Sequence, residues 1–375
     1  MRRLMNILVT GGAGFIGANF IRLLFGEGSL KSHTIESEFK GRIINLDALT
    51  YAGNAANLKE IDKKFGGGRF FFEHGDICDQ ANVERIFQKY NIDTVVHFAA
   101  ESHVDRSILS PKTFTETNVI GTFNLLETAK KFWEKSGNSF GTDVLFHHIS
   151  TDEVYGSLGE TGYFIEATAY APRSPYSASK AASNHMVMAY FHTYGLPVTI
   201  SNCSNNYGPY QFPEKFIPLM ILNMIDGKPF PVYGDGKNIR DWLYVEDHNA
   251  AVWAILQKGR TGETYNIGGD NQWENIKLLN ALIDILAKKT GQNAEKTRAS
   301  ISYIKDRPGH DRRYAIDCSK IKKELEWKQK LNIEEGLEHT VDWYLTNPEW
   351  IENVRSGEYQ NWMKRNYIER QCALH

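Results

Sequence analysis

Residues 6–25 read NILVTGGAGFIGANFIRLLF. The apolar residues 6–10 favour a strand, and residues 18–25 space their apolar side chains as a helix does. A glycine-rich turn therefore leads from a strand into the amino end of a helix. Free N–H groups and a partial positive charge gather at such an end, so the stretch predicts a binding site for a phosphate-bearing ligand.

The three glycines spaced along this turn can each serve such a site. Gly11 permits the tight turn, Gly14 lets the backbone approach a pyrophosphate, and Gly17 lets the helix pack closely. A glycine cluster can equally be an ordinary turn, so the prediction depends on the next elements of the chain.

The next strand supplies that context. Residues 42–46 favour a strand that ends at Asp47, whose carboxylate suits hydrogen bonds to an adenosine ribose. An acid there repels a 2′-phosphate and so favours NAD over NADP. The interval from Gly17 to Asp47 exceeds the usual twenty or so residues, because residues 28–41 read as a polar loop insertion.

Strand and helix patterns alternate through the first half of the chain. Strand patterns cover residues 70–75, 94–98, 144–149 and 196–202, and helical patterns cover 83–90, 111–133 and 176–194. This alternation predicts right-handed crossovers and a parallel sheet with helices on both faces. The predicted fold class is α/β: a Rossmann-type doubly wound parallel sheet with a smaller carboxyl-terminal α/β substrate domain.

A polar loop at residues 203–210 ends the alternation and marks the expected domain change. We expect an NAD-binding Rossmann domain in residues 1–207, to which the chain returns at about 241–268. Residues 208–240 and 269–375 would form the second domain. After the loop, helical patterns cover residues 216–225, 245–256, 276–289, 316–336 and 338–344, and extended patterns cover 231–233 and 301–304. The helix at 245–256 is expected to pack back on the first domain.

The composition is that of a folded protein, with 42% hydrophobic residues in a chain of 375. A net charge of -2 argues against a general nucleic-acid surface. No run approaches the roughly 20 apolar residues of a membrane span, and the first residues lack the apolar stretch of a signal peptide. The four cysteines have no paired spacing, which suggests neither a disulfide framework nor a metal site. We expect a cytoplasmic protein that binds neither nucleic acid nor membrane.

Tyr176 and Lys180 form a candidate catalytic pair. They come after Pro175 in a run of alanines and serines, and their spacing places both side chains on one face of a helix. An ammonium beside a phenol favours the phenolate, which lowers the cost of using tyrosine as a base near neutral pH. The same spacing recurs at Tyr233 and Lys237, where two glycines make the segment a turn.

Thr151, Asp152 and Glu153 come after the apolar residues 144–149 and would stand where a strand ends, which is where parallel sheets place chemistry. Neighbouring acids commonly lie on a solvated loop or cap the next helix. Their place between a central strand and the helix of Tyr176 favours a catalytic role.

Arg240, Arg307 and His310 lie in loops of the second half that are marked by glycine or proline. They could simply pair with neighbouring aspartates. Arginines in the domain that must hold the substrate also suit a bidentate grip on a diphosphate. His147 and His148 read as buried strand residues and are assigned no chemistry.

Taken together, these motifs resemble the extended short-chain dehydrogenase/reductase superfamily and, within it, the dTDP-glucose 4,6-dehydratase family. The resemblance covers residues 6 to about 370. The segments that carry it are TGGAGFIG at 10–17, LDALTYAGN at 46–54, AAESHVD at 99–105, TDE at 151–153, the asparagine-rich loop at 203–210, RDWLYVEDH at 240–248 and the arginine cluster from 307. The acid pair is the most specific of these. Related epimerases are expected to lack it, and related decarboxylases and GDP-mannose dehydratases to keep only the glutamate.

The resemblance implies a hydro-lyase that converts dTDP-glucose to dTDP-4-keto-6-deoxy-glucose plus water, a step toward deoxysugars such as rhamnose. Tyr176, helped by Lys180 and Thr151, would take the proton of the carbon-4 hydroxyl while hydride passes to bound NAD. Glu153 would remove the carbon-5 proton while protonated Asp152 donates to the departing carbon-6 hydroxyl. Hydride would then return to carbon 6.

The binding residues are implied in the same way. The NAD site would comprise Gly11, Gly14, Phe15, Ile16, Gly17, Asp47, Ala48, Leu49, Thr50, Asp76, Ile77, Phe98, Ala99, Ala100, Ser102, Thr117, Tyr176, Lys180 and Asn206. The dTDP-glucose substrate, held largely by a nucleotide-sugar-binding second domain, would contact Ser102, Thr151, Asn205, Lys215, Phe216, Pro231, Tyr233, Arg240, Asn275, Arg307 and His310. A homodimer is expected, through the helices at 111–133 and 176–194.

Two rival functions are compatible with the same scaffold. One is another NAD-dependent sugar-nucleotide enzyme, an epimerase or a decarboxylase, against which the acid pair speaks. The other is a catalytically silent NAD-sensing or scaffold protein, against which Tyr176 and Lys180 speak. No residue read from the sequence accounts for thymine over uracil in the nucleotide.

Overall fold

The computed structural model describes residues 2–30, 39–135 and 139–355. Its centre is a seven-stranded sheet in the order β12-β8-β7-β4-β1-β2-β3, and every neighbouring pair is parallel. The strands are β1 (Asn6–Thr10), β2 (Arg42–Asp47), β3 (Phe70–His74), β4 (Thr94–His97), β7 (Leu145–Thr151), β8 (Val198–Cys203) and β12 (Glu263–Ile267). The predicted Rossmann-type doubly wound sheet is confirmed.

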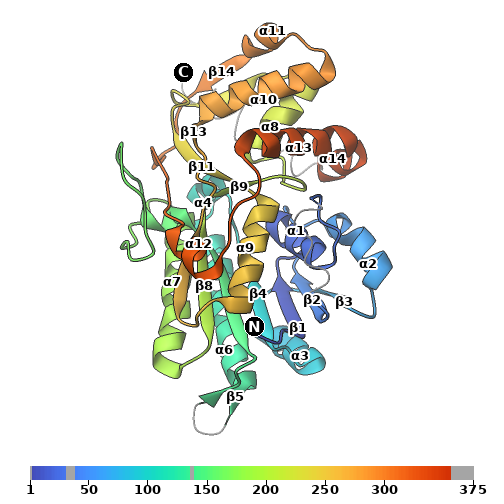
Figure 1. Cartoon of the computed structure of the whole chain (residues 1–375), viewed down its shortest axis with the longest axis vertical. Helices are drawn as coiled ribbons and strands as arrows, with labels where there is room; N and C mark the ends of the chain where they lie inside the picture. The colour runs from blue at the N-terminus through green and yellow to red at the C-terminus, as the bar shows by residue number, and fades with distance from the viewer. Residues whose placement is uncertain (1, 31–38, 136–138, 356–375) are drawn as a thin grey trace.

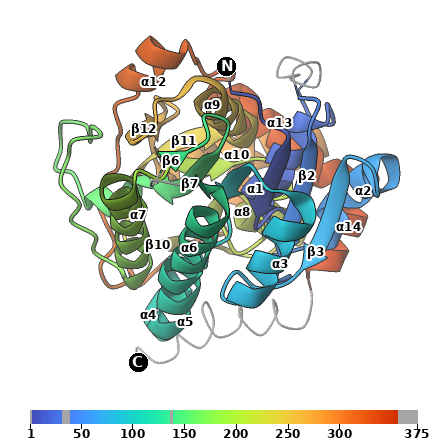
Figure 2. The same cartoon turned by 90° about the horizontal axis from the view of Figure 1, so that it is seen from below.

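Side-chain alternation along the strands explains why both faces of the sheet are covered. In β1, Ile7 and Val9 belong to one buried cluster while Leu8 belongs to another. Successive strand residues point to opposite faces, so a run that is apolar throughout needs helices on each side. Helices α1 (Phe15–Leu24) and α9 (Val245–Lys258) supply one face. The other face is covered by α3 (Gln80–Tyr90), α6 (Thr122–Trp133) and α7 (Pro175–Tyr194), and Figure 2 shows α6 and α7 side by side.

A second, smaller body lies beyond the carboxyl ends of these strands and occupies the upper part of Figure 1. Its core is formed by apolar side chains of α8, α10 and α13. It contains a parallel pair of strands, β10 with β14, and a three-stranded sheet in the order β13-β11-β9. Its elements are β9 (Asn205–Tyr207), α8 (Phe216–Ile225), β10 (Phe230–Tyr233), β11 (Ile239–Tyr244), β13 (Gln272–Glu274), α10 (Asn275–Thr290), α11 (Ala294–Arg298), β14 (Ile301–Ile304), α13 (Ile333–Thr346) and α14 (Pro348–Val354).

Short elements connect the larger ones. They are the 3₁₀ turns η2 (Ala55–Leu58) and η4 (Asp152–Tyr155), the π-helical η3 (Thr115–Gly121), the helices α2 (Lys59–Phe65), α4 (Val104–Leu109), α5 (Pro111–Phe114) and α12 (Ser319–Leu325), and the small strands β5 (Glu134–Lys135) and β6 (Ser139–Phe140). The single α-helix expected at 111–133 is thus α5 and α6 joined through a π-helical stretch.

The helix expected over 316–336 is wrong, because the chain leaves helical geometry between α12 and α13. Glu326 adopts a left-handed conformation (φ 59°) that ends α12. Asn332 then starts α13 with a capping box, in which its side chain accepts from the Glu335 N–H and the Glu335 side chain accepts from the Asn332 N–H. The left-handed residue that ends α12 and the capping box that starts α13 lie within seven residues of each other. Together they interrupt the helix that the continuous apolar spacing predicts. The later helix expected at 338–344 is part of α13.

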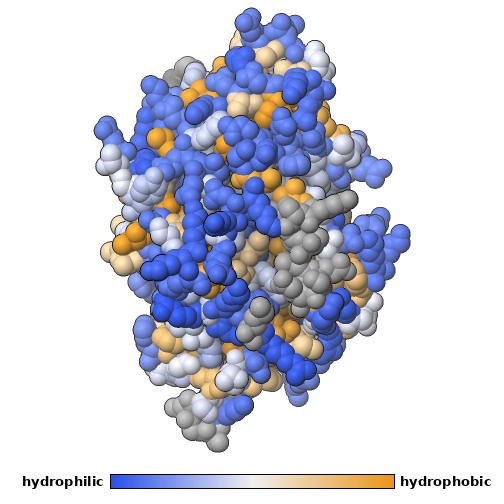
Figure 3. Space-filling model, viewed as in Figure 1, coloured by the Kyte–Doolittle hydropathy of each residue, from blue (hydrophilic) through white to orange (hydrophobic). Residues whose placement is uncertain are grey.

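The surface seen in Figure 3 is mainly hydrophilic, with hydrophobic residues in small separate patches. Within the described part of the chain, no helix has both the length and the apolarity to cross a bilayer. The expected insertion at 28–41 falls largely on residues outside the described ranges, as do Cys372 and the end of the second domain. The described start of the insertion is held by Glu246, whose carboxylate accepts from the backbone N–H groups of Ser29 and Leu30.

Candidate active site

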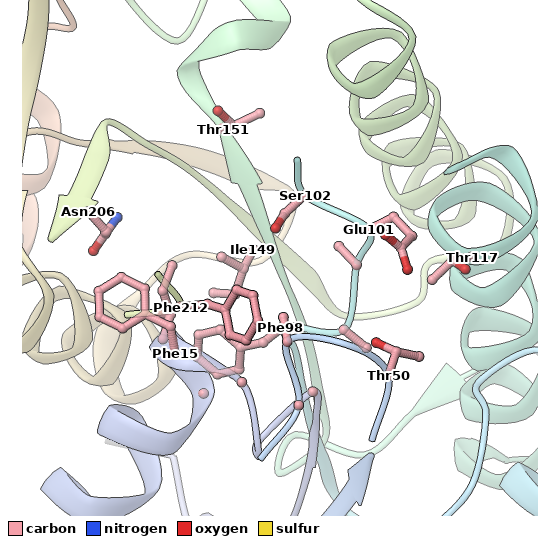
Figure 4. A pocket seen from close by; sticks show the side chains of 18 of the residues that line it. Phe15, Thr50, Phe98, Glu101, Ser102, Thr117, Ile149, Thr151, Asn206 and Phe212 are labelled. Carbon is pink, nitrogen blue, oxygen red and sulfur yellow. The ribbon is translucent and has the colours of Figure 1, made fainter. Parts of the chain in front are cut away.

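A cavity of about 320 Å³ opens where β1, β2, β4, β7 and β8 end, between the sheet and the second body. Figure 4 shows Thr151 at the end of β7, with Ser102 and Asn206 below it and Phe15, Phe98, Ile149 and Phe212 gathered deeper in the pocket. Open parallel sheets bind ligands at this edge, where the strand order reverses around β1 and β4.

Most residues expected at the NAD site line this one cavity. They are Gly11, Gly14, Phe15, Ile16, Gly17, Asp47, Ala48, Thr50, Asp76, Ile77, Phe98, Ala99, Ala100, Ser102, Thr117, Tyr176, Lys180 and Asn206. Leu49 is the exception. It stands in the left-handed region (φ 49°) and turns its N–H toward the Asp47 carboxylate, 2.8 Å away, so its contribution is to the shape of the loop.

The glycine turn is too tight for any larger residue at two positions. A Cβ on Gly11 would come within 2.6 Å of the backbone nitrogen of Ala99, and Gly11 has a positive φ of 72°. A Cβ on Gly17 would lie 2.5 Å from the carbonyl oxygen of Gly11. The turn therefore brings the amino end of α1 against the sheet and leaves the cavity next to it open.

Asp47 ends β2 at the rim of the cavity and is buried. Its two carboxylate oxygens accept from the backbone N–H groups of Ala13 and Leu49, each at 2.8 Å. A carboxylate can accept about four hydrogen bonds, so two positions are left for ligand hydroxyls. Burial raises the pKa of Asp47, while the two backbone N–H groups oppose that rise.

Thr151, Asp152 and Glu153 stand where β7 passes into η4, as the sequence predicted. Thr151 caps the turn, because its Oγ1 accepts from the Glu153 N–H at 3.2 Å. Asp152 is 2% exposed and its Oδ2 has no hydrogen-bond partner among the described residues. Burial raises the pKa of Asp152 well above its ordinary value, and the charges of Glu153 and Asp241 add to that rise. Burial and these charges therefore favour the protonated form of Asp152.

Glu153 has a different environment from its neighbour. Burial raises its pKa as well, but the positive charges of Arg307, Arg240 and Lys215 oppose the rise. These cations come from the second body and the segment leading into it, so they stabilise the ionised form of Glu153 beside a protonated Asp152. The two environments therefore favour Asp152 as the proton donor and Glu153 as the proton acceptor of the site.

Tyr176 and Lys180 lie on the first turns of α7. Ser174 caps this helix, since its Oγ accepts from the Ser177 N–H at 3.1 Å while the Ser177 Oγ accepts from the Ser174 N–H at 3.0 Å. Both members of the pair line the cavity.

The prediction that Lys180 lowers the pKa of Tyr176 is wrong for this structure. Burial raises the pKa of Tyr176 well above 10, the charges of Glu153 and Cys203 add to the rise, and the Thr151 hydroxyl opposes it. The Lys180 ammonium is engaged with β7 instead, donating to the carbonyl oxygen of Ile149 at 2.7 Å. Burial lowers the pKa of Lys180 to about 8.

The residues expected to hold substrate divide into two groups. Ser102, Thr151, Asn205 and Lys215 line the cavity. The others lie in the second body, outside the cavity lining: Phe216, Pro231, Tyr233, Arg240, Asn275, Arg307 and His310. Arg240 and Arg307 of the second group act by charge on Glu153, which also lines the cavity. Within the second group, the Tyr233 ring lies 6.1 Å from that of His310.

The alternative in which the basic residues pair with neighbouring aspartates holds for only one of them. His310 Nδ1 lies 2.5 Å from Asp306 Oδ1. Arg240 instead donates to the backbone oxygen of Asp311 at 3.0 Å and its guanidinium carbon lies 4.3 Å from the Tyr314 ring centroid. Burial alone would lower the pKa of Arg307, but the charges of Asp105 and Glu153 outweigh burial and raise it.

Sequence reasoning missed several residues that line the cavity. They are Leu46, Ala52, Gly53, Gly75, Ile149, Ser150, Cys203, Ser204, Gln211, Phe212 and Glu214. The segment 211–214 is the clearest omission, because it reads as an ordinary loop. Only its position directly before Lys215 could have indicated it.

A seven-stranded doubly wound sheet, a glycine turn at its switch point and a Tyr-Lys pair on a helix beside the cavity define an extended short-chain dehydrogenase/reductase. The chain matches the family described as GDP-mannose 4,6 dehydratase over residues 8–340. It is 51% identical over 376 residues to the dTDP-glucose 4,6-dehydratase of Salmonella typhimurium, covering 98% of this chain and 100% of that one.

Solved structures give the same relationship. The dTDP-glucose 4,6-dehydratase of Bacillus anthracis in complex with NAD is 44% identical with a TM-score of 0.80, covering 94% of this chain and 100% of that chain. DesIV of Streptomyces venezuelae, a dTDP-glucose 4,6-dehydratase with NAD and TYD bound, is 43% identical with a TM-score of 0.83 and the same coverage. The chain belongs to the dTDP-glucose 4,6-dehydratase family.

Proposed function

We propose that the protein is an NAD-dependent hydro-lyase that converts dTDP-glucose to dTDP-4-keto-6-deoxy-glucose and water. The observation that carries this proposal is the difference between two adjacent acids: burial and neighbouring carboxylates favour the protonated form of Asp152, whereas three cations favour the ionised form of Glu153. Elimination of water needs one group to take a proton and another to give one. The names of the relatives at about half identity support the choice of substrate.

The cavity fits NAD on several counts. The tight turn at Gly11 and Gly17 leaves the amino end of α1 open to a pyrophosphate, and Asp47 retains acceptor positions for a ribose. The buried amide oxygens of Asn205 and Asn206 have no hydrogen-bond partner among the described residues, and Asn206 faces the cavity in Figure 4. We propose that the cavity-lining residues given above hold the cofactor. When bound, NAD supplies a reversible hydride acceptor for carbon 4 and donor for carbon 6.

The first proton transfer falls to Tyr176. Its phenol would take the proton of the carbon-4 hydroxyl, and Thr151 at the end of β7 would hydrogen bond to the same hydroxyl. The raised pKa of Tyr176 means that the ionised phenol would need positive charge nearby. The oxidised nicotinamide of bound NAD would supply such charge, and Lys180 would add to it through the N–H that it does not direct to β7.

The elimination falls to the acid pair. A ketone at carbon 4 acidifies carbon 5, and the Glu153 carboxylate would remove that proton. Asp152 would donate its proton to the leaving carbon-6 hydroxyl, and its buried Oδ2 has no hydrogen-bond partner among the described residues. Because the hydride taken from carbon 4 would be returned to carbon 6, deuterium placed on carbon 4 would appear on carbon 6 of the product.

The grip on the nucleotide is assigned to the second body. Arg240 and Arg307 act by charge on Glu153, the Tyr233 ring contacts that of His310, and Lys215 lines the cavity. The Arg307 Nε is buried without a hydrogen-bond partner among the described residues, as suits a donor kept for a diphosphate. We assign Phe216, Pro231 and Asn275 to the same subsite. We propose residues 1–207 with 241–268 as the NAD domain and 208–240 with 269–375 as the nucleotide-sugar domain. The paired strands β9 and β11 lie at the boundary of this division, and apolar side chains between residues 314 and 327 join the core of the large sheet.

A homodimer completes the proposal. Ile108, Leu109, Ile120 and Phe123 are each 36–51% exposed along α4, η3 and α6, on the flank that carries α7. Apolar side chains along adjoining helices suit a second copy of the chain. A cytoplasmic location is proposed with it.

Incubation of the purified protein with dTDP-glucose, followed by mass spectrometry of the nucleotide sugar, tests the function. We expect a product lighter by one water and no net formation of NADH. A product of unchanged mass, as a 4-epimer would be, would contradict the proposal, as would no turnover with NAD bound. Parallel kinetics with UDP-glucose measure the preference for thymine.

A further inference from the structure

Lys180 makes two contacts with a single strand. Its Nζ is 2.7 Å from the carbonyl oxygen of Ile149 and 3.4 Å from Nε2 of His148, both on β7. The lysine is 4% exposed. An ammonium has three N–H bonds, so two point to β7 and the third is left for the cavity that Lys180 lines.

The contact with His148 fixes the protonation of that ring. His148 is fully buried, and burial together with the Lys180 charge lowers its pKa well below 6.5, so the ring is neutral. An ammonium can only donate, so Nε2 must be the bare nitrogen and Nδ1 must carry the proton. Nδ1 has no hydrogen-bond partner among the described residues, so the contact of Nε2 is the one that anchors the ring.

The neighbour of His148 does not compete for Lys180. The His97 ring on β4 lies 5.2 Å away, with its Nδ1 2.7 Å from Thr10 Oγ1 and its Nε2 2.9 Å from Thr122 Oγ1. The Thr122 hydroxyl donates to the Asn118 carbonyl, so it must accept from Nε2 of His97. Both ring nitrogens of His97 are therefore occupied. The other titratable groups that face Lys180 are Cys203 on β8, whose pKa is raised by burial, and Tyr176 on its own helix.

We propose that His148 is a positioning residue of the reaction, whose bare Nε2, together with the Ile149 carbonyl, fixes the Lys180 ammonium so that its third N–H points into the cavity. This inference rests on the proposed function, since it assigns the orientation of a group that the reaction uses. It gives a role to a strand histidine that the sequence left without one.

Mutation of His148 separates this role from simple packing. His148→Leu fills much of the same volume without an acceptor, whereas His148→Gln places an amide oxygen near the position of Nε2. His147→Leu is the matched control. His147 is equally buried on the same strand, but its ring contacts Thr199 and Ser201 and not Lys180.

We expect His148→Leu to lower kcat for dTDP-glucose roughly 10- to 100-fold, the range that a small misplacement of a catalytic group costs. Because the lost acceptor stabilised the ammonium, the alkaline limb of the kcat profile should move to lower pH. His148→Gln should restore most of the rate and the wild-type profile. His147→Leu should lower the melting temperature without moving the profile. A folded His148→Leu with a wild-type rate and profile would overturn the proposal, as would equal defects in the Leu and Gln variants.

A second measurement, made on the wild-type protein, tests the His148 assignment even if His148→Leu does not fold. Nitrogen-15 shifts of labelled histidines, with the His148 signal assigned from its absence in His148→Gln, report which ring nitrogen carries the proton. We expect the Nδ1–H form, and an Nε2–H form would refute the contact because that nitrogen could not accept. This readout needs no turnover, so it separates failure of the His148 assignment from failure of the proposed dehydratase activity.

Discussion

Arg106 on α4 donates from Nε to Oε2 of Glu214 at 3.0 Å, and this ion pair joins the sheet side of the cavity to the segment before α8. The Glu214 side chain is 1% exposed. The Arg106 guanidinium also lies 3.7 Å from the ring centroid of Tyr51, which in turn packs edge-on against Phe212. Phe212 and Glu214 both line the cavity, so these contacts hold the wall formed by residues 211–215 in place.

Glu214→Ala should therefore loosen that wall. The substitution removes the carboxylate that pairs with the largely buried Arg106. The free energy of unfolding should fall by about 2–3 kcal/mol, because removing one partner of a buried ion pair is strongly destabilising. The bound cofactor should also dissociate faster, which the loss of fluorescence of bound NADH after addition of excess NAD measures. The control is Glu116→Ala, which removes an exposed pair with Lys112 and should cost less than about 1 kcal/mol. Equal losses in the two variants would contradict the role of the Glu214 pair.

The acid pair should control only the second stage of the reaction. The double variant Asp152→Asn with Glu153→Gln keeps the shape of both side chains but removes the proton donor and the proton acceptor. Oxidation at carbon 4 should proceed and then stop, so that enzyme-bound NADH accumulates on addition of dTDP-glucose. The near-ultraviolet absorbance of the reduced cofactor measures this directly. Glu160→Gln, in an exposed loop, should turn over as the wild type does. Normal turnover by the double variant would refute the assigned roles.

Lys180 should reduce stability while it serves catalysis. Burial lowers its pKa from 10.5 to about 8, which corresponds to about 3 kcal/mol at 1.4 kcal/mol per pKa unit. Below pH 8 the lysine is charged in both the folded and the unfolded chain, so this cost is fully present. Between pH 8 and 10.5 only the unfolded chain keeps the proton, so the contribution of Lys180 to stability improves as the pH rises.

Lys180→Met removes the buried charge at similar volume. We expect an inactive protein whose free energy of unfolding at pH 7 is about 1–3 kcal/mol greater, the lost hydrogen bond to Ile149 offsetting part of the gain. Urea unfolding of the two proteins at pH 7 measures the difference. A clear loss of stability would show that the hydrogen bonds of Lys180 outweigh the burial of its charge.

The glycine turn should tolerate no side chain at Gly17. In Gly17→Ala the Cβ would meet the backbone of Gly11 and Gly12 at 2.5 and 2.8 Å, so the strand and α1 must separate. We expect a loss of about 1–3 kcal/mol in stability, as for other overpacked sites, and weaker NAD binding by calorimetry. Gly159→Ala, where a Cβ meets nothing within 4 Å, should change neither. Unaltered NAD affinity in Gly17→Ala would show that this turn is not the pyrophosphate site.

Much of the sheet could be predicted because its signals are local. Strands β1, β2, β3 and β4 begin where the apolar patterns do, and in the second body α8 spans the predicted residues 216–225. The helices failed where end signals decided the outcome. Glu326 and Asn332 interrupt a continuous apolar pattern, and the π-helical η3 has no signature in residue spacing.

The sequence by itself determined the glycine turn, the order of strand and helix, and the types of group at the site: two acids at a strand end and a Tyr-Lys pair one helix later. These depend on neighbours within a few residues. Only the tertiary structure decided the protonation of those groups, because a pKa depends on burial and on charges that arrive from distant segments. Arg307 and Arg240 oppose the rise in the pKa of Glu153 in this way, and burial together with the charges of Glu153 and Cys203 raises the pKa of Tyr176. Those segments meet at the cavity because the order of the strands brings them there, and that order is a property of the whole fold.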